Sequence, residues 1–286
     1  GDEVLVGAIM EHLEEAGIHS GDSTCFIPPQ NIAEHVLAEV EDWTKRIGIE
    51  LGIRGCFNIQ YAIRDEVLYV LEVNPRGSRT FPFVAKATGV PLARIAARLA
   101  IGDKLADLDV PLPQTDAVCV KAPVFPFIKL RGLDPAPGPE MKSTGEVMGS
   151  HVRASAAYLK ARLATELPVP VEGGVYITVK DGDKLAIIDE ARRLQEMGFT
   201  LYATRGTSHV LRDVGGLDVQ TCYRIAERRS PDALDLMRQG KIHLIVNTPR
   251  STGGAVLDGN MMRRLAVELN IPVSYTHLTL PTILRV

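Results

Sequence analysis

Apolar residues recur at two different periods along the chain, and these periods predict where its helices and strands lie. Residues 31–52 carry apolar side chains at spacings of three and four, which predicts a helix with one buried face. Residues 55–63 and 67–73 are apolar or alternating runs on either side of the polar segment 64–66, a pattern typical of an antiparallel hairpin. Residues 82–99 predict one or two helices, broken at Gly89 and Pro91.

The last third of the chain alternates regularly between strand and helix patterns. Strands are predicted at 175–179, 200–203, near 219 and at 242–246, with helices at 184–198, 231–239 and 260–269. This alternation predicts a parallel sheet with helices on both faces. The fold class of the whole chain is therefore α/β together with α+β.

A domain boundary is predicted between these two parts. Residues 117–149 contain five prolines and predict short extended pieces that wrap a domain rather than form one. A helix is predicted at 154–166, and the Pro- and Gly-rich segment 167–174 follows it. We therefore expect one domain at 1–166 and a second at 167–286.

The hairpin carries oxygen-bearing side chains close to its end. With the turn centred on residue 65, Gln60 would lie opposite Val70 and diagonal to Glu72. Because side chains alternate along a strand, Asn58, Gln60, Glu72 and Asn74 would share one face. One carboxylate with neutral amide oxygens suits a hard cation such as Mg²⁺ that also binds substrate phosphates.

Two arginines directly follow this strand. Arg76 and Arg79 could bind a phosphoryl or carboxylate group that the metal organises. Taken alone, a glutamate at a strand end is usually a solvated edge residue, and an Asn-Pro pair is usually a turn. The combination on one face favours the functional interpretation.

Composition and charge exclude several functions. The 286 residues suffice for about two domains, and 45% apolar with 23% charged residues is ordinary for a globular protein. The net charge is −3, and no basic run suggests binding to nucleic acid. Four scattered cysteines, without a signal peptide or a membrane-length apolar run, predict a reduced cytoplasmic setting and no membrane partner.

Two loops at one edge of the predicted parallel sheet could bind an anion. Residues 204–207 (Thr-Arg-Gly-Thr) and 247–251 (Asn-Thr-Pro-Arg-Ser) both follow strands, and ligands bind beyond the carboxyl ends of such strands. Hydroxyls and exposed backbone N–H groups there could bind a phosphate. Either loop alone would more often only cap a helix. Their shared edge favours a ligand.

The motifs resemble a known family. Glu72-Val-Asn-Pro-Arg76, with Gln60 upstream, is similar to the metal-binding end of the ATP-grasp fold. Its continuation through residues 79–92 narrows the resemblance to the carbamoyl-phosphate synthase large subunit. Residues 11–23 and 138–149 agree with that family too. The similarity extends to about Val273, and the atypical tail 274–286 is assigned no function.

The resemblance implies a reaction for the first domain. It matches the second synthetase half, where ATP phosphorylates carbamate to carbamoyl phosphate for pyrimidine and arginine biosynthesis. The carbamate derives from bicarbonate and ammonia, and a glutaminase small subunit supplies the ammonia. The full-length protein is expected to be an oligomer. Because the chain starts inside the second lobe of an ATP-grasp domain, we expect it to be inactive alone.

The resemblance also assigns roles to residues of the first domain. Mg²⁺ or Mn²⁺ would be held by Gln60, Glu72 and Asn74, with Glu72 bridging two ions. Arg76 and Arg79 would be catalytic. ATP would contact Gln60, Glu72 and the segment Gly17, Ile18, His19 and Ser20.

The second domain resembles the methylglyoxal-synthase-like regulatory domain of the same family. This implies a nucleotide effector bound by six residues, namely Thr178, Lys184, Thr204, Thr207, Arg224 and Asn247. Methylglyoxal synthase activity is not expected, because Asp213 is followed by Val-Gly-Gly and the Gly-Gly-Asp arrangement of that enzyme is missing.

Two other interpretations remain open. The chain could be an effector-binding module whose ATP-grasp remnant is not catalytic, in which case nucleotide binding would not depend on Glu72. It could also be part of a different ATP-grasp ligase, since the metal ligands are shared by that wider group. The regulatory domain that follows argues against the second of these.

Overall fold

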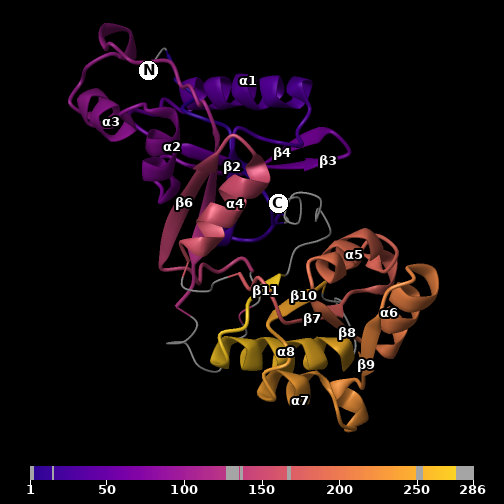
Figure 1. Cartoon of the computed structure of the whole chain (residues 1–286). Coiled ribbons are helices and arrows are strands. Elements are labelled where there is room, and N and C mark those ends of the chain that lie inside the picture. The colour runs from indigo at the N-terminus through magenta and orange to yellow at the C-terminus, as the bar shows by residue number, and fades with distance from the viewer. Residues whose placement is uncertain are drawn as a thin grey trace. The chain divides into compact units, whose positions relative to one another are not determined.

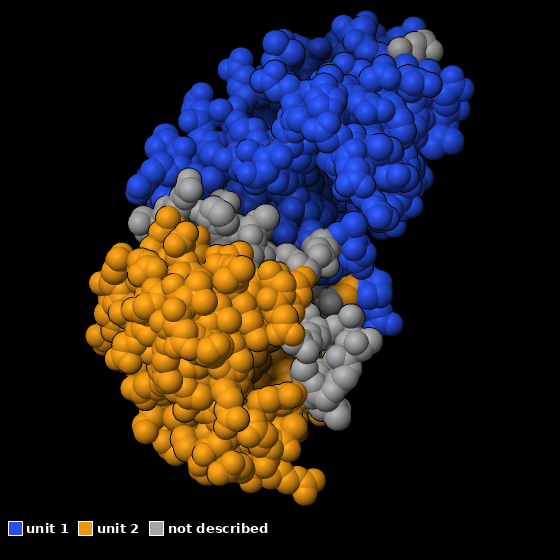
Figure 2. Space-filling view, turned by 90° about the vertical axis from the view of Figure 1, so that its right-hand side faces the viewer, with its two compact units in different colours: residues 1–123, 139–141, 146–161 blue, residues 124–138, 142–145, 162–286 orange. Residues whose placement is uncertain are grey.

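The computed structural model describes residues 3–14, 16–126, 135, 138–165, 169–248 and 254–274. The chain divides into two compact units, shown in different colours in Figure 2. Unit 1 comprises residues 1–123, 139–141 and 146–161, and unit 2 comprises 124–138, 142–145 and 162–286. The boundary expected after residue 166 stays a prediction, since residues 166–168 lie outside the described part of the chain.

The longer helices of unit 1 follow the apolar periodicity. They are α1 (Glu34–Glu50), α2 (Thr80–Thr88), α3 (Leu92–Ala100) and α4 (Ala154–Leu163), with short 3₁₀ turns η1 (Ser20–Asp22) and η2 (Leu105–Asp107). Helix α1 buries Val36 and Val40, as its pattern predicts. Helix α2 ends at Gly89, whose φ of 73° is a left-handed conformation that favours glycine. The predicted break between α2 and α3 is confirmed.

A four-stranded sheet lies in unit 1, with the order β1 (Glu11–His12), β2 (Cys25–Ile27), β5 (Val118–Val124) and β6 (Gly145–His151). The expectation that residues 117–149 only wrap a domain is therefore wrong. Most of the prolines that suggested irregular structure fall between β5 and β6. Pro123 lies near the end of β5, so the greater part of that strand retains its N–H groups.

Helix α4 packs closely on this sheet. Buried Phe26, Val120 and Ala122 form an apolar cluster with Ala157 and Ala161 of the helix. A Cβ atom at Gly149 of β6 would lie only 2.3 Å from the backbone oxygen of Ala157. Glycine at position 149 is therefore required for the distance between strand and helix.

Strands β3 (Asn58–Arg64) and β4 (Val67–Asn74) form the predicted antiparallel hairpin. Its register differs from the simple expectation. Gln60 lies opposite Glu72 and Tyr61 opposite Val70, with a β-bulge between the two pairs, so the predicted pairing of Gln60 with Val70 is wrong. The Tyr61 hydroxyl lies 2.9 Å from Thr44 Oγ1 of α1, which ties the hairpin to that helix.

Unit 2 contains a five-stranded parallel sheet (Figure 1), with the order β11 (Val273–Ser274), β10 (Leu244–Asn247), β7 (Gly174–Thr178), β8 (Thr200–Thr204) and β9 (Val219–Cys222). One apolar cluster joins one face to α5 (Ile188–Glu196), and another joins the opposite face to α7 (Ala233–Arg238) and α8 (Gly254–Glu268). The predicted parallel sheet with helices on both faces is confirmed.

Some element bounds in unit 2 differ from the expectation. Helix α5 begins at Ile188 rather than residue 184, because residues 181–183 form a 3₁₀ turn, η4 (Asp181–Asp183). Helix α8 begins at Gly254, before the predicted start at residue 260. The short helix α6 (Arg205–His209) follows β8 and continues into a π-helical turn at Val210–Val214, and a further 3₁₀ turn, η6 (Ile225–Glu227), follows β9.

Candidate functional site

The end of the β3–β4 hairpin brings the predicted oxygen donors together. Asn58 pairs with Asn74 and Gln60 with Glu72 across the two strands, so all four side chains belong to one face. The Asn74 amide Nδ2 donates to Glu72 Oε1 at 2.9 Å, and Asn74 Oδ1 accepts from Arg76 at 3.4 Å. A carboxylate, an amide and a guanidinium thus form one chain of contacts.

This face fits a metal ion that arrives with a phosphate ligand. It offers one exposed carboxylate, Glu72, and the amide oxygens of Gln60 and Asn74, while the buried Asn58 Oδ1 has no hydrogen-bond partner among the described residues. The described residues include no group of three or more acidic, histidine or cysteine side chains that could hold a metal. Mg²⁺ typically takes one or two carboxylates and completes its shell with water and phosphate oxygens.

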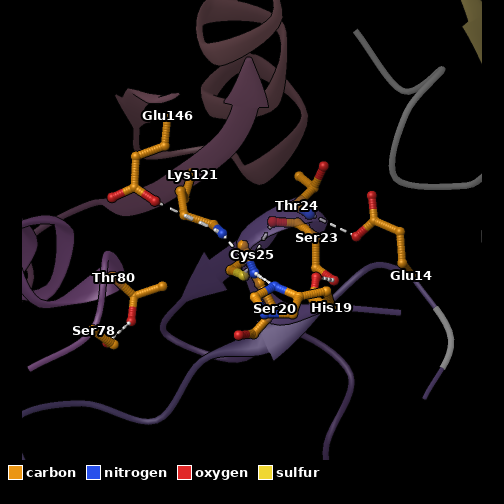
Figure 3. A network of polar contacts seen from close by, with 11 residues as sticks. Glu14, His19, Ser20, Ser23, Thr24, Cys25, Ser78, Thr80, Lys121 and Glu146 are labelled. Atoms are coloured by element: carbon orange, nitrogen blue, oxygen red, sulfur yellow. Dashed lines mark hydrogen bonds and ion pairs between the residues drawn. The ribbon is translucent and has the colours of Figure 1, made fainter. Parts of the chain in front are cut away.

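A buried lysine lies at the centre of the second group of polar residues in unit 1 (Figure 3). Lys121 of β5 is fully buried, and its Nζ donates to the backbone oxygen of Ser20 at 2.9 Å. The same Nζ lies 3.9 Å from Glu146 Oε2 of β6. Burial raises the pKa of Glu146, while the charges of Lys121 and Arg79 act in the opposite direction.

Ser20, the last residue of the predicted nucleotide segment Gly17–Ser20, therefore contacts Lys121. His19 Nδ1 accepts from the backbone N–H of Gly21 at 3.0 Å and caps the turn η1. In this conformation His19 orders the turn, and the turn presents the Ser20 carbonyl to the lysine. The charge of Arg79 acts on the pKa of Glu146, so Arg79 belongs to the same polar region as Ser20 and Lys121.

Sequence reasoning missed four members of this region, namely His12, Glu14, Lys121 and Glu146. Glu14 Oε2 accepts from the backbone N–H of Thr24 at 2.6 Å, and burial raises the pKa of Glu14 to about 7. Burial, with a smaller contribution from Lys121, lowers the pKa of His12 to about 4. The usable signal was the lysine inside the apolar run 118–122, because an interior strand position is costly for an unpaired charge.

In unit 2, a cavity of about 230 Å³ opens where strands β7, β8 and β10 end, and all six residues predicted to bind an effector line it. They are Thr178, Lys184, Thr204, Thr207, Arg224 and Asn247. The Asn247 amide Nδ2 donates to the Thr178 backbone oxygen at 3.2 Å. Asn247 Oδ1 is buried and has no hydrogen-bond partner among the described residues.

Both cations of this cavity are paired with carboxylates. Lys184 Nζ lies 2.7 Å from Asp181 Oδ1, and an Arg224 guanidinium nitrogen lies 3.4 Å from Asp258 Oδ2. The second predicted loop is described only in part, since residues 249–251 lie outside the described residues. Its Thr248 Oγ1 accepts from the backbone N–H of Lys180 at 2.9 Å.

Comparison with known proteins finds two family models that match separate parts of the chain. Residues 1–108 match the family described as carbamoyl-phosphate synthase L chain, ATP binding domain, and residues 186–275 match the MGS-like domain. The carbamoyl phosphate synthase large chain, C-terminal section, of Methanocaldococcus jannaschii is 47% identical over 283 residues, which cover 95% of this chain and 46% of the relative. The large chain of Methanoculleus marisnigri is 48% identical over 272 residues, 95% of this chain and 26% of the relative.

A solved methylglyoxal synthase from Elizabethkingia anophelis NUHP1 aligns with a TM-score of 0.31 and 17% identity over 41% of this chain and 80% of that chain, a likeness too weak to support a conclusion.

The chain thus carries a match to an ATP-binding domain, followed by a match to an MGS-like domain. It spans about half of the first relative and about a quarter of the second. Over 95% of its length it is similar to the carbamoyl-phosphate synthase large chain, and the relative from Methanocaldococcus jannaschii is a C-terminal section of that chain. Among the described residues, no helix has the length and apolar character needed to cross a membrane.

Proposed function

We propose that the protein of which this chain forms a part uses ATP to phosphorylate carbamate, giving carbamoyl phosphate. The observation that carries the proposal is the shared face of Gln60, Glu72 and Asn74, which leads directly to Arg76 within a domain of the ATP-binding family. Carbamate would derive from bicarbonate and from ammonia supplied by a glutaminase chain. The product would enter pyrimidine and arginine biosynthesis.

In phosphoryl transfer the protein mainly positions groups and neutralises charge. Glu72, with the amide oxygens of Gln60 and Asn74, would hold Mg²⁺ or Mn²⁺, which neutralises the nucleotide phosphates when bound. The Asn74 N–H bond to Glu72 fixes the direction of the carboxylate. The Asn74 oxygen fixes Arg76 in turn, and this holds a guanidinium next to the place where charge develops.

Arg79 and Lys121 have separate tasks in this proposal. Arg79 would bind the carbamate carboxylate, for which the planar guanidinium is well matched. Lys121 acts indirectly, because its Nζ holds the Ser20 carbonyl and so fixes the turn that would contact the nucleotide. The four cysteines are free thiols, which supports the proposed cytoplasmic setting.

The metal face can be tested by calorimetric titration of the chain with ATP and Mg²⁺. We expect Glu72→Gln to weaken binding by about ten-fold or more, since changes around a metal ion commonly cost about 10- to 100-fold. The matched control is Glu66→Gln, which alters an exposed glutamate at the turn of the same hairpin. Equal affinity of Glu72→Gln and the unmodified chain would refute the assignment of Glu72.

The catalytic role requires the complete protein. In the complete large chain with its glutaminase partner, Glu72→Gln should abolish carbamate-dependent ADP formation, whereas Glu66→Gln should preserve it. Binding of nucleoside monophosphates without any binding of ATP and Mg²⁺ would favour the alternative of a regulatory module with a non-catalytic ATP-grasp remnant.

For unit 2 we propose binding of a nucleotide effector in the 230 Å³ cavity. Two cations and three threonine side chains line it and suit a phosphate group. The Asn247 oxygen, which has no hydrogen-bond partner among the described residues, could accept from a donor on the rest of the ligand. Asp213 is exposed and contacts His209, and it is not among the described residues that line this cavity. Methylglyoxal synthase activity is therefore not part of the proposal.

A further inference from the structure

The Lys184 side chain reaches the backbone of the predicted phosphate loop 204–207 in unit 2. A Cβ atom at Gly206 would lie 2.9 Å from Lys184 Nζ, so the ammonium group rests against that part of the loop. The Lys184 side chain is only 18% exposed. Its charge therefore belongs to the cavity, where Thr204 and Thr207 supply hydroxyls.

The carboxylate that contacts Lys184 has a different environment. Asp181 is in the turn η4, and its side chain is 67% exposed, although its Oδ1 lies only 2.7 Å from Lys184 Nζ. An anionic oxygen at this distance occupies one of the donor directions that a bound phosphate would need. Because Asp181 is largely solvated, it can leave Lys184 at small cost.

The second ion pair of the cavity provides a comparison. Asp258, on helix α8, is only 19% exposed and lies 3.4 Å from Arg224. A carboxylate that is largely removed from water and sits on a helix is displaced less easily than one on an exposed turn. Of the two carboxylates, Asp181 is therefore the one that a ligand can replace.

We propose that Asp181 competes with the anionic group of the ligand for Lys184 and thereby sets the affinity of the cavity. This inference rests on the proposed binding of a phosphorylated effector. In the empty cavity the Asp181 carboxylate neutralises the ammonium group. When a phosphate binds, it replaces Asp181 as the ionic partner of Lys184. The Asp181 carboxylate then points into solvent and still repels the phosphate, because both groups are negatively charged.

The test is a calorimetric titration of the full chain with inorganic phosphate, and separately with a nucleoside monophosphate, at low ionic strength. Replacing Asp181 by Asn keeps the shape and removes the charge. Removing the competing exposed ion pair can raise the binding constant of the ligand by a factor of up to about five. Removing the repulsion between the Asp181 carboxylate and the bound phosphate raises it further. We therefore expect Asp181→Asn to tighten binding by about three- to ten-fold.

Two further variants make the result specific. Asp189→Asn makes the same change of net charge at an exposed position of α5, and it should alter the affinity by less than about two-fold because solvent screens distant charges. Lys184→Gln should weaken binding strongly, and adding Asp181→Asn to it should then have little effect, since the two residues act through one contact.

The outcomes separate this inference from the effector proposal. If the unmodified chain binds either ligand and Asp181→Asn binds no more tightly than Asp189→Asn, competition by Asp181 is refuted and the effector site stands. If Asp181→Asn binds more weakly, Asp181 positions Lys184 for the ligand, which also overturns the inference. If neither ligand binds to any variant, the effector proposal and this inference both fail.

Discussion

Replacing Lys121 by methionine should destabilise unit 1 substantially. The lysine is fully buried, donates to the Ser20 carbonyl at 2.9 Å and lies 3.9 Å from Glu146 Oε2. Methionine has a similar length and fills the same space without a charge. The substitution therefore removes the polar contacts of the ammonium group and largely preserves the packing.

The size of the effect follows from three contributions. A hydrogen bond to a charged group contributes about 1.5–3 kcal/mol. Breaking a buried ion pair from one side costs about 3–5 kcal/mol, because the other charge stays without compensation. Glu146 is 15% exposed, and its pKa is already raised by burial, so it can protonate and reduce that cost. Methionine also avoids the cost of desolvating the lysine charge. We therefore expect Lys121→Met to lower the free energy of unfolding by about 2–4 kcal/mol.

The single tryptophan makes the measurement specific to unit 1. Trp43 lies on α1, so its fluorescence during urea unfolding reports the unit that contains Lys121. At a slope of about 1–3 kcal/mol per molar urea, the expected loss lowers the midpoint by about 1 M or more. The control is Lys86→Met on the exposed side of α2, which should shift the stability by less than about 0.5 kcal/mol.

A second variant tests the cause. In Lys121→Met with Glu146→Gln, the carboxylate no longer needs a partner, so about 1 kcal/mol or more should be regained relative to Lys121→Met. A loss below about 0.5 kcal/mol in Lys121→Met, or a double variant less stable than the single one, would refute the stabilising role of this ion pair.

Two further predictions concern the stability of unit 1, both followed by Trp43 fluorescence. Gly149→Ala should lower the free energy of unfolding by about 1–3 kcal/mol, because the alanine Cβ would meet the α4 backbone. The control Gly77→Ala should be tolerated, since its Cβ would make only an ordinary contact at 3.6 Å. Equal effects of the two variants would contradict the packing argument. Burial raises the pKa of Glu14 from 4.5 to about 7, so its stabilising contribution is complete below pH 4.5 and is lost as pH rises through 7. Glu14→Gln should therefore be more stable to unfolding than the unmodified chain by up to about 3 kcal/mol at pH 8, and equally stable at pH 4. The same difference in stability at both pH values would refute the raised pKa of Glu14.

The same unit carries an opposite dependence on pH that Glu14→Gln should expose. The pKa of His12 is lowered from 6.5 to about 4. Its contribution to the free energy of unfolding is therefore fully present above pH 6.5 and is lost as pH falls through 4. Between pH 4.5 and 6.5 the contributions of Glu14 and His12 oppose each other. Stability should hence vary little with pH in this window until one of the two groups is removed.

Local patterns predicted the regular elements well. The hairpin, the helix pair broken at Gly89 and the parallel sheet of unit 2 all follow from periodicity and turn residues close in sequence. The cavity of unit 2 was predictable for a more general reason, because strands of a parallel sheet end at the same edge and loops that follow them must meet there.

Contacts between distant segments were not predictable in the same way. Strands β5 and β6 pair across a proline-rich connection, and no local pattern reveals that their partners are each other. The polar region around Lys121 depends on that pairing, because Lys121, Glu146 and Ser20 come from three separate segments. A lysine in an apolar strand signals a buried partner but does not identify it.

The β-bulge explains why the metal face forms although the simple register was wrong. Tyr61 pairs with Val70, so an uninterrupted ladder would place Gln60 opposite Leu71. Alternation would then direct Glu72 to the face of Tyr61, which is the face tied to α1. The extra residue, Leu71, shifts the register by one, so that Glu72 comes opposite Gln60.

The same shift brings Asn74 opposite Asn58. In a regular strand, Leu68 and Glu72 would lie on the same face, because they are four residues apart and side chains alternate. A regular hairpin of this sequence could therefore bury Leu68 or expose Glu72 beside Gln60, but it could not do both. Because of the bulge, even-numbered residues of β4 lie on one face before Leu71 and on the opposite face after it. Leu68 is accordingly buried while Glu72 is exposed, and the proposed metal face exists only because the ladder is interrupted between them.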